Sequence, residues 1–180
     1  NGYYIRQMDL DRLIELCLPY LSEFVEPNSP FVIPAKAGIQ KNFLDSDFRQ
    51  NDNNMDYVQK IVALEQERLK KLSDIGECTK YFFERPEIDP KMLVWRKSNL
   101  SDAKEKLQFL ITELQKVPEE NWTRSALEQF IKGLIEAEKF DTGAVLWPMR
   151  VALSGEEKSP SPFEIAEVLG KEETVERIKL

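Results

Sequence analysis

The residues of this sequence that could recognise a ligand lie in two proline-containing runs and one basic cluster. The first run, Leu146-Trp147-Pro148-Met149-Arg150, would place an arginine just after a rigid turn. A planar guanidinium can donate two parallel hydrogen bonds to a base edge or a phosphate, so Arg150 is a candidate binding residue. The alternative is a proline-kinked helix with Trp147 in the core and Arg150 at the surface, and the local pattern by itself favours that alternative.

The second run, Ser159-Pro160-Ser161-Pro162-Phe163-Glu164-Ile165, combines two prolines with the start of a helix. Prolines stiffen the loop, and a helix N-terminus presents free backbone N–H groups and a positive dipole that suit a phosphate or a base acceptor. An ordinary capped loop is the alternative, and this stretch alone favours it.

The basic cluster is Arg68-Leu69-Lys70-Lys71-Leu72, which would put three cations within one helical turn. Such a group is usually a solvated helix face. Four further lysines would extend a basic surface only if the fold brings them together: Lys80, Lys132, Lys139 and Lys158.

We expect no catalytic residue and no metal site in this chain. It contains no histidine, which removes the commonest general base and the commonest metal ligand. Its two cysteines, Cys17 and Cys78, are spaced for neither a zinc site nor a redox pair, so we expect the buried, reduced thiols of a cytosolic protein. The acidic pairs Glu119-Glu120 and Glu172-Glu173 do not face one another on a helix, and we expect solvated charges at helix starts.

The composition is that of a soluble globular protein, with 42% apolar and 32% charged residues. The formal net charge of −7 argues against nucleic-acid binding unless basic residues gather locally on the side that faces RNA. No apolar run is long enough to span a membrane. The first residues form no signal peptide and include no initiating methionine, so we expect a fragment of a longer protein.

Apolar residues recur at helical spacing along most of the chain, and no segment alternates as a strand does, so the pattern predicts an all-α fold. Proline, glycine and capping residues separate the helices, and Pro19 predicts a kink or an early end in the first of them. The predicted N-caps include Ser73, Asp89 and Thr123, and Gly170 is a predicted helix stop signal. The predicted helices cover residues 8–21, 56–72, 73–83, 90–95, 98 or 101 to 114, 123–137, 142 onward with an interruption at Pro148, and 163–169 with a further helix after Gly170.

Several of these runs together resemble the C-terminal half of bacterial glutamyl-tRNA synthetases. Asn1-Gly2-x-Tyr4-Ile5-Arg6 is similar to the junction that follows the catalytic and stem-contact domains. The stretch from Gln66-Glu67-Arg68-Leu69 to Tyr81-Phe82-Phe83 resembles the first anticodon-binding subdomain. Three later stretches resemble the last subdomain and keep the family's order and spacing: Trp147-Pro148-Met149-Arg150 through Ser154-Gly155, Ser159 through Ile165, and Leu169-Gly170-Lys171-Glu172.

The resemblance implies an all-α fold of two small helical subdomains, at residues 1–97 and 98–180, that form the anticodon-binding helical cage of a class I aminoacyl-tRNA synthetase. The family joins glutamate to tRNA(Glu) with ATP. Its class I signatures are absent, because the chain has no histidine and Lys91-Met92 continues to Leu93. We therefore expect anticodon-loop recognition without aminoacylation, with no cofactor in this chain and with ATP and Mg confined to the catalytic domain of the whole enzyme.

The resemblance also implies roles for individual residues. Arg68 matches the position that reads the third anticodon base, where an arginine accompanies discrimination of tRNA(Glu) from tRNA(Gln). Arg150 matches an arginine that contacts the other anticodon bases. Ser159 and Pro162 match loop positions beside those bases, although their side chains are not the usual ones there. Nearby lysines are candidates for phosphate contacts: Lys70, Lys71 and Lys158.

The segment 29–51 has no counterpart in the family pattern. Its runs at 30–40 and 45–52 resemble translated mobile palindromic repeats that occur inside some bacterial genes. We expect an in-frame insertion carried as a surface excursion, because the cost of closing a loop grows slowly with its length. An ordinary lineage-specific loop is the alternative, and neither has a separate function.

The leading hypothesis is a cytoplasmic, monomeric RNA-binding module whose partner is tRNA(Glu), with no DNA or membrane partner. The alternative is a helical protein-interaction module without RNA binding, which the acidic balance and the apolar insertion would favour.

Overall fold

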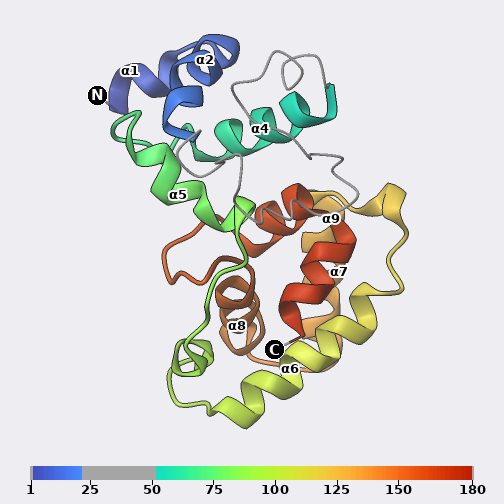
Figure 1. Ribbon diagram of the computed structural model, residues 1–180. Helices are drawn as coiled ribbons and strands as arrows, with labels where there is room; N and C mark the ends of the chain where they lie inside the picture. Colours follow the sequence, from blue (N-terminus) through green and yellow to red (C-terminus); the bar gives the residue numbers. More distant parts are fainter. Residues whose placement is uncertain (1, 22–51, 180) are drawn as a thin grey trace. The chain divides into compact units, whose positions relative to one another are not determined.

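The computed structural model describes residues 2–21 and 52–179, and side chains in the second range from residue 55 (Figure 1). Every regular element in this part of the chain is a helix, which confirms the all-α prediction for it. The expected insertion at 29–51 lies outside the described residues. The chain forms two compact units, Asn1–Glu84 and Arg85–Leu180.

The first unit is built from α1 (Gly2–Gln7), α2 (Leu10–Leu21), α4 (Asp52–Glu65) and α5 (Asp74–Phe83). Helix α2 packs on both α4 and α5. It runs past the exposed Pro19 to the fully buried Leu21, so the proline does not end it early. The apolar faces of these helices meet in a core that includes Leu13, Leu21, Val58, Ile61, Ile75 and Phe82.

The predicted helix through residue 72 is too long, because α4 ends at Glu65. The Glu65 carbonyl accepts from the backbone N–H groups of both Arg68 and Leu69, at 2.8 and 2.9 Å, and this turns the chain out of the helix. Ser73 precedes α5 as predicted, but its side chain makes no capping hydrogen bond. Instead, an Asp74 carboxylate oxygen accepts from the Lys71 N–H at 3.2 Å.

The second unit contains η2 (Pro90–Leu93), α6 (Leu100–Leu114), η3 (Glu119–Asn121), α7 (Arg124–Ala137), α8 (Thr142–Ser154) and α9 (Pro162–Ile178). Helix α8 packs on α9, α6, α7 and η2 and is the centre of this unit. The apolar side chains of α8 that are buried in this unit are those of Val145, Met149, Val151, Ala152 and Leu153.

Short polar side chains start the helices of this unit. Thr123 accepts from Ala126 N–H and Asp89 accepts from Lys91 N–H, which confirms both predicted caps. Asn99 caps α6, where the sequence predicts a start at Ser98 or Ser101, and Asp141 caps α8. These side chains satisfy N–H groups that have no partner inside the helix.

Two predicted breaks have different outcomes. Helix α8 continues through Pro148, so the predicted interruption is wrong, and the buried proline packs within the core of the unit. Gly170 does break α9, because its φ of 78° and ψ of 170° are not helical. That conformation favours glycine, and its position agrees with the predicted stop signal.

Residues 85–97 belong to the second unit, whereas the boundary expected from the sequence lies after Lys97. The physical reason is packing, since η2 lies against α8 and α6. The indole Nε1 of Trp147 in α8 donates to the Met92 carbonyl at 2.7 Å, which ties η2 to the centre of this unit.

Neither Cys17 nor Cys78 is joined in a disulfide in the described part of the chain. Cys17 is fully buried, and burial raises its pKa to about 11, whereas Cys78 is half-buried. In the described ranges 2–21 and 52–179, no helix combines the length and apolarity that crossing a membrane requires.

Candidate functional site

The first candidate surface is the loop between α4 and α5, which carries Arg68. The Arg68 Nε donates to a Glu65 carboxylate oxygen at 3.0 Å, and the same carboxylate accepts from the Tyr81 hydroxyl at 3.4 Å. Glu65 is 1% exposed, whereas 44% of the Arg68 side chain is exposed. A buried carboxylate thus holds an accessible guanidinium in one orientation, which reduces the conformational freedom it would lose on binding a ligand.

This loop is fastened to α1, a helix that the sequence pattern did not predict. The Gln66 amide donates to the carbonyls of Ile5 and Met8, both at 2.9 Å, and the Arg6 Nε donates to the Glu67 carbonyl at 3.0 Å. A Cβ at Gly2 would lie 3.0 Å from the Leu69 carbonyl. Helix α1 has only six residues, so its hydrogen bonds to the loop stabilise it rather than its own propensity.

Lys70 and Lys71 follow in the same loop, and both side chains are exposed. Neither ammonium group has an ion pair within the described part of the chain. They lie on a loop and not on a helical face, so the expectation of three cations in one helical turn is wrong. The loop presents two solvated cations beside the oriented guanidinium of Arg68.

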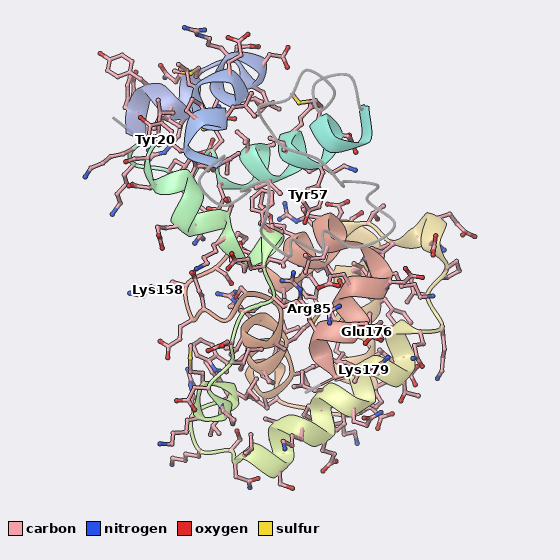
Figure 2. All side chains as sticks on the ribbon, viewed as in Figure 1. Tyr20, Tyr57, Arg85, Lys158, Glu176 and Lys179 are labelled. Carbon is pink, nitrogen blue, oxygen red and sulfur yellow. The ribbon has the colours of Figure 1, made fainter. Side chains whose placement is uncertain are left out.

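The second candidate surface lies in the other unit, along α8 and the loop that follows it. Arg150 is half-buried on α8, two residues after Pro148. Trp147 is half-buried rather than part of the core, because its indole reaches the Met92 carbonyl. Lys158 is exposed on the loop between α8 and α9 (Figure 2).

The end of α8 depends on Gly155. Its φ is 70°, and its N–H donates to the Val151 carbonyl at 2.7 Å, which is the left-handed termination that glycine favours. A Cβ at this position would also lie 2.6 Å from the Cβ of Pro86. Both the backbone angle and the neighbouring proline therefore require a residue without a side chain.

Replacing Gly155 by alanine is expected to lower the free energy of unfolding by at least about 1–2 kcal/mol, because alanine is strained in the left-handed region and its Cβ meets Pro86. Urea denaturation of the purified chain measures this. Gly133→Ala is the matched control, since Gly133 is exposed in α7 with no atom within 4 Å of its added Cβ. That variant should gain about 0.5–1 kcal/mol. Equal stability of Gly155→Ala and the wild type would contradict the argument.

The loop before α9 is closed by a capping box. The Ser161 hydroxyl accepts from the Phe163 N–H at 3.2 Å, and the Glu164 carboxylate accepts from the Ser161 N–H at 2.9 Å. Glu164 also pairs with Arg124 at 2.8 Å. A carboxylate and a hydroxyl therefore occupy this helix N-terminus, and the capped-loop alternative describes it better than an open phosphate site.

Ser159 and Pro162 are buried in this loop. Ser159 is 4% exposed, and its hydroxyl donates to the Pro160 carbonyl at 3.2 Å. Pro162 is the first residue of α9, where its missing N–H costs no helical hydrogen bond. In this conformation the two residues shape the loop, while the exposed side chain beside them is that of Lys158.

Glu173 in α9 is not the solvated charge expected from the sequence. Its two carboxylate oxygens accept from Arg85 Nε and Nη2 at 2.9 and 2.8 Å, and one of them also accepts from Arg177 Nε at 2.7 Å. Arg177 Nη1 donates further to the Leu153 carbonyl at 2.9 Å. Sequence reasoning missed this cluster because its first member lies 88 positions before Glu173.

Comparison with known proteins covers nearly the whole chain. The family model for an anticodon binding domain matches residues 12–180. Glutamate–tRNA ligase 2 of Thermoanaerobacter pseudethanolicus is 32% identical over 99% of this chain. Glutamate–tRNA ligase of Clostridium botulinum is 32% identical over 100% of it. The chain spans 32% of the length of each of these relatives.

Solved structures agree with the sequence comparison. The crystal structure of a glutamate tRNA ligase from Elizabethkingia meningosepticum, in complex with its amino acid, matches 99% of this chain and 30% of its own, with a TM-score of 0.67 and 25% identity. The glutamate-tRNA synthetase from Elizabethkingia anophelis covers 98% of this chain and 29% of its own, with a TM-score of 0.62. At 23% identity, the second likeness concerns the fold alone.

Proposed function

Because this chain belongs to the anticodon binding domain family, in the form found in glutamate–tRNA ligases, we propose that it binds the anticodon loop of tRNA(Glu). The observation that carries the proposal is the extent of the family match, which includes both candidate surfaces. Anticodon bases are unstacked and splayed, so that protein side chains can hydrogen-bond to their Watson–Crick edges. Arginine suits this task because its planar guanidinium group can donate hydrogen bonds to two acceptors of a base at once.

In this proposal, Arg68 and Arg150 hydrogen-bond to anticodon bases, and three lysines contact phosphates: Lys70, Lys71 and Lys158. Ser159 and Pro162 shape the loop beside the bases. The orientation of Arg68 by the buried Glu65 supports its role, since a base reader must hold a defined geometry. The burial of Ser159 supports a positioning role for that residue in the free chain.

The net charge of −7 does not by itself oppose this role, because an ion pair neutralises an acidic side chain together with a basic one, and a local surface of unpaired cations can still be basic. Lys60, Lys116 and Lys132, for example, each pair with a carboxylate three or four residues away. Cations that have no such pair among the described residues, including Lys70 and Lys71, can bind RNA phosphates. Binding of this kind weakens as salt concentration rises, because it releases condensed counterions.

The activity of the whole ligase also belongs to the proposal, since the chain spans only 32% of its relatives. We propose that the parent enzyme joins glutamate to tRNA(Glu) with ATP and Mg in a separate catalytic domain. This chain contributes tRNA recognition to it, as a monomer in the cytoplasm, and has no DNA partner. The described residues contain no cluster of three or more potential metal ligands.

Replacing Arg150 by alanine is expected to weaken binding to tRNA(Glu) by about 1–3 kcal/mol, because the variant loses a two-point contact to a base. A gel-shift titration of the chain against tRNA(Glu), tRNA(Gln) and an anticodon-substituted tRNA(Glu) measures this. Arg12→Ala is the control, since Arg12 is exposed on α2 and paired with Glu15 at 2.7 Å.

Two outcomes would contradict the proposal at different levels. Equal affinity of wild type and Arg150→Ala for tRNA(Glu) would remove Arg150 from the site. No binding of the wild-type chain to any of the three RNAs, together with self-association in light scattering, would favour the protein-interaction alternative instead.

A further inference from the structure

Four cations in η2, in the first turns of α6 and in the loop that joins them have no acidic partner among the described residues. They are Lys91, Arg96, Lys97 and Lys104, and all four are exposed. We call them the 91–104 cation cluster. Neighbouring lysines are different: Lys106 lies 3.5 Å from Asp102, and Lys116 lies 2.5 Å from Glu113. In a chain with a net charge of −7, a stretch of unpaired cations needs a separate explanation.

Arg96 in this cluster is held over an aromatic ring. Its guanidinium carbon lies 4.8 Å from the centroid of the Trp95 ring, a distance typical of a cation–π contact. Stacking of this kind covers a face of the guanidinium and leaves its N–H groups pointing outward in the plane of the fork. Those groups are the donors that a phosphate accepts from.

Trp95 is itself fixed in position by α8. Its ring centroid lies 5.1 Å from that of Trp147, whose indole donates to the Met92 carbonyl. A Cβ at Gly143 would lie 2.3 Å from the Trp95 ring, so the indole packs directly on the helix backbone there. The ring under Arg96 is therefore a rigid support and not a loose surface side chain.

The backbone around Arg96 is also constrained. Trp95 N–H donates to the Ser98 hydroxyl at 3.1 Å, and Ser98 N–H donates to the Trp95 carbonyl at 2.8 Å. These bonds close a turn in which Arg96 has a φ of 46°. A non-glycine residue in the left-handed region is uncommon and costs conformational energy, and the hydrogen bonds of the surrounding turn keep Arg96 in that conformation.

The acidic groups near this cluster are committed to other partners. Asp89 accepts from Lys91 N–H at the start of η2, and Asp141 accepts from Ala144 N–H at the start of α8. Asp102 and Glu105 both lie beside Lys106, at 3.5 and 3.7 Å. None of these four carboxylates forms an ion pair with a member of the 91–104 cation cluster, so the cations keep their capacity for an external anion.

We propose that the 91–104 cation cluster, with Arg96 stacked on Trp95, binds the sugar–phosphate backbone of the tRNA as a second, sequence-independent contact. This inference rests on the proposed function. Phosphate contacts position a nucleic acid without reading its bases, and they dominate its affinity. The cluster supplies that affinity on an acidic chain, whereas Arg68 and Arg150 supply discrimination.

The test uses the full chain with the double variant Arg96→Asn and Lys97→Gln. Asparagine tolerates the left-handed backbone of position 96, so the turn is kept while the cation is removed. The control is the double variant Lys116→Gln and Lys132→Gln, which removes the same charge from two lysines already paired with Glu113 and Glu128. Binding to tRNA(Glu) and to an anticodon-substituted tRNA(Glu) is measured over a range of salt concentrations.

The Arg96→Asn/Lys97→Gln chain should bind both RNAs more weakly by the same factor. Its slope of log affinity against log salt should fall by about 2, or about one for each lost phosphate contact. The control should keep the wild-type slope. If the double variant does not fold, as judged by circular dichroism, Lys91→Gln with Lys97→Gln tests the same cluster without touching the turn.

Several results would overturn the inference while leaving the proposed function intact. One is wild-type affinity and salt slope in the cluster variant. Another is a loss confined to the cognate anticodon, which would make the cluster a base reader. Unchanged tRNA binding with lost binding to poly-L-glutamate would assign the cluster to an acidic polypeptide. A wild-type chain that binds no tRNA would instead refute the proposed function itself.

Discussion

Replacing Glu173 by alanine should lower the free energy of unfolding by about 3–5 kcal/mol, which is the usual cost of breaking a buried ion pair by removing one partner. The Glu173 side chain is 6% exposed, and it lies between Arg85 and Arg177. Removing the carboxylate leaves the Arg177 guanidinium, which is only 3% exposed, without its counter-charge. The Arg85 side chain is 60% exposed, so water can solvate its guanidinium once the carboxylate is gone. The Arg85 pair therefore contributes less to the free energy of unfolding than the buried Arg177 pair.

The free energy of unfolding should also depend on pH through the ionisation of Glu173. Burial of the Glu173 carboxyl opposes its ionisation, but hydrogen bonds from Arg85 and Arg177 outweigh burial and hold its pKa below the ordinary value. A group with a depressed folded-state pKa stabilises the protein above its unfolded pKa, and that contribution is lost as pH falls through the folded pKa. The wild type should therefore lose stability in the acid range more steeply than Glu173→Gln, which has no carboxyl to titrate at this site.

Urea denaturation at neutral pH and at several acid pH values measures both effects. Glu176→Gln is the matched control, because Glu176 is an exposed glutamate on the same helix that pairs with Lys179. It should change stability by less than about 1 kcal/mol. A Glu173→Ala chain as stable as the Glu176→Gln chain would show that the cluster adds nothing to the fold.

Replacing Arg68 by glutamine should relax the preference for the third anticodon base by about 1–3 kcal/mol, with a smaller change in overall affinity. Glutamine has neither the charge nor the fork of arginine, so the discriminating hydrogen bonds are lost. The effect follows from the geometry of the loop, in which Glu65 orients the guanidinium and 44% of the side chain remains exposed.

Binding titrations with tRNA(Glu) variants that differ only at the third anticodon position measure this preference. Arg68→Lys is the first control, because it keeps a cation near the buried Glu65 carboxylate but lacks the planar fork. Lys70→Gln is the second, because loss of a phosphate contact should weaken all variants alike and lower the salt slope. If Arg68→Gln also weakens every variant equally, Arg68 acts as a phosphate contact and does not read the base.

Local sequence signals determined much of the helical framework. The caps at Thr123 and Asp89 and the break at Gly170 lie where the sequence predicts them, because each acts through hydrogen bonds or backbone angles within a few residues. The family resemblance rested on the same local runs, and the match over residues 12–180 confirms it. The sequence also identifies Arg68 and Arg150 as candidate binding residues, and their RNA contacts stay predictions.

Tertiary structure decided the features that depend on distant partners. Helix α1 forms against the Gln66 loop, some sixty residues away along the chain, and its six residues carry no periodic signal of their own. Glu173 is buried because Arg85 and Arg177 compensate its charge, whereas the sequence alone indicated a solvated glutamate. The support of Arg96 by Trp95 likewise requires Gly143 and Trp147 from another helix. Such contacts join residues far apart in sequence, so no local pattern predicts them, and only the folded chain shows which charges are paired and which remain available to a ligand.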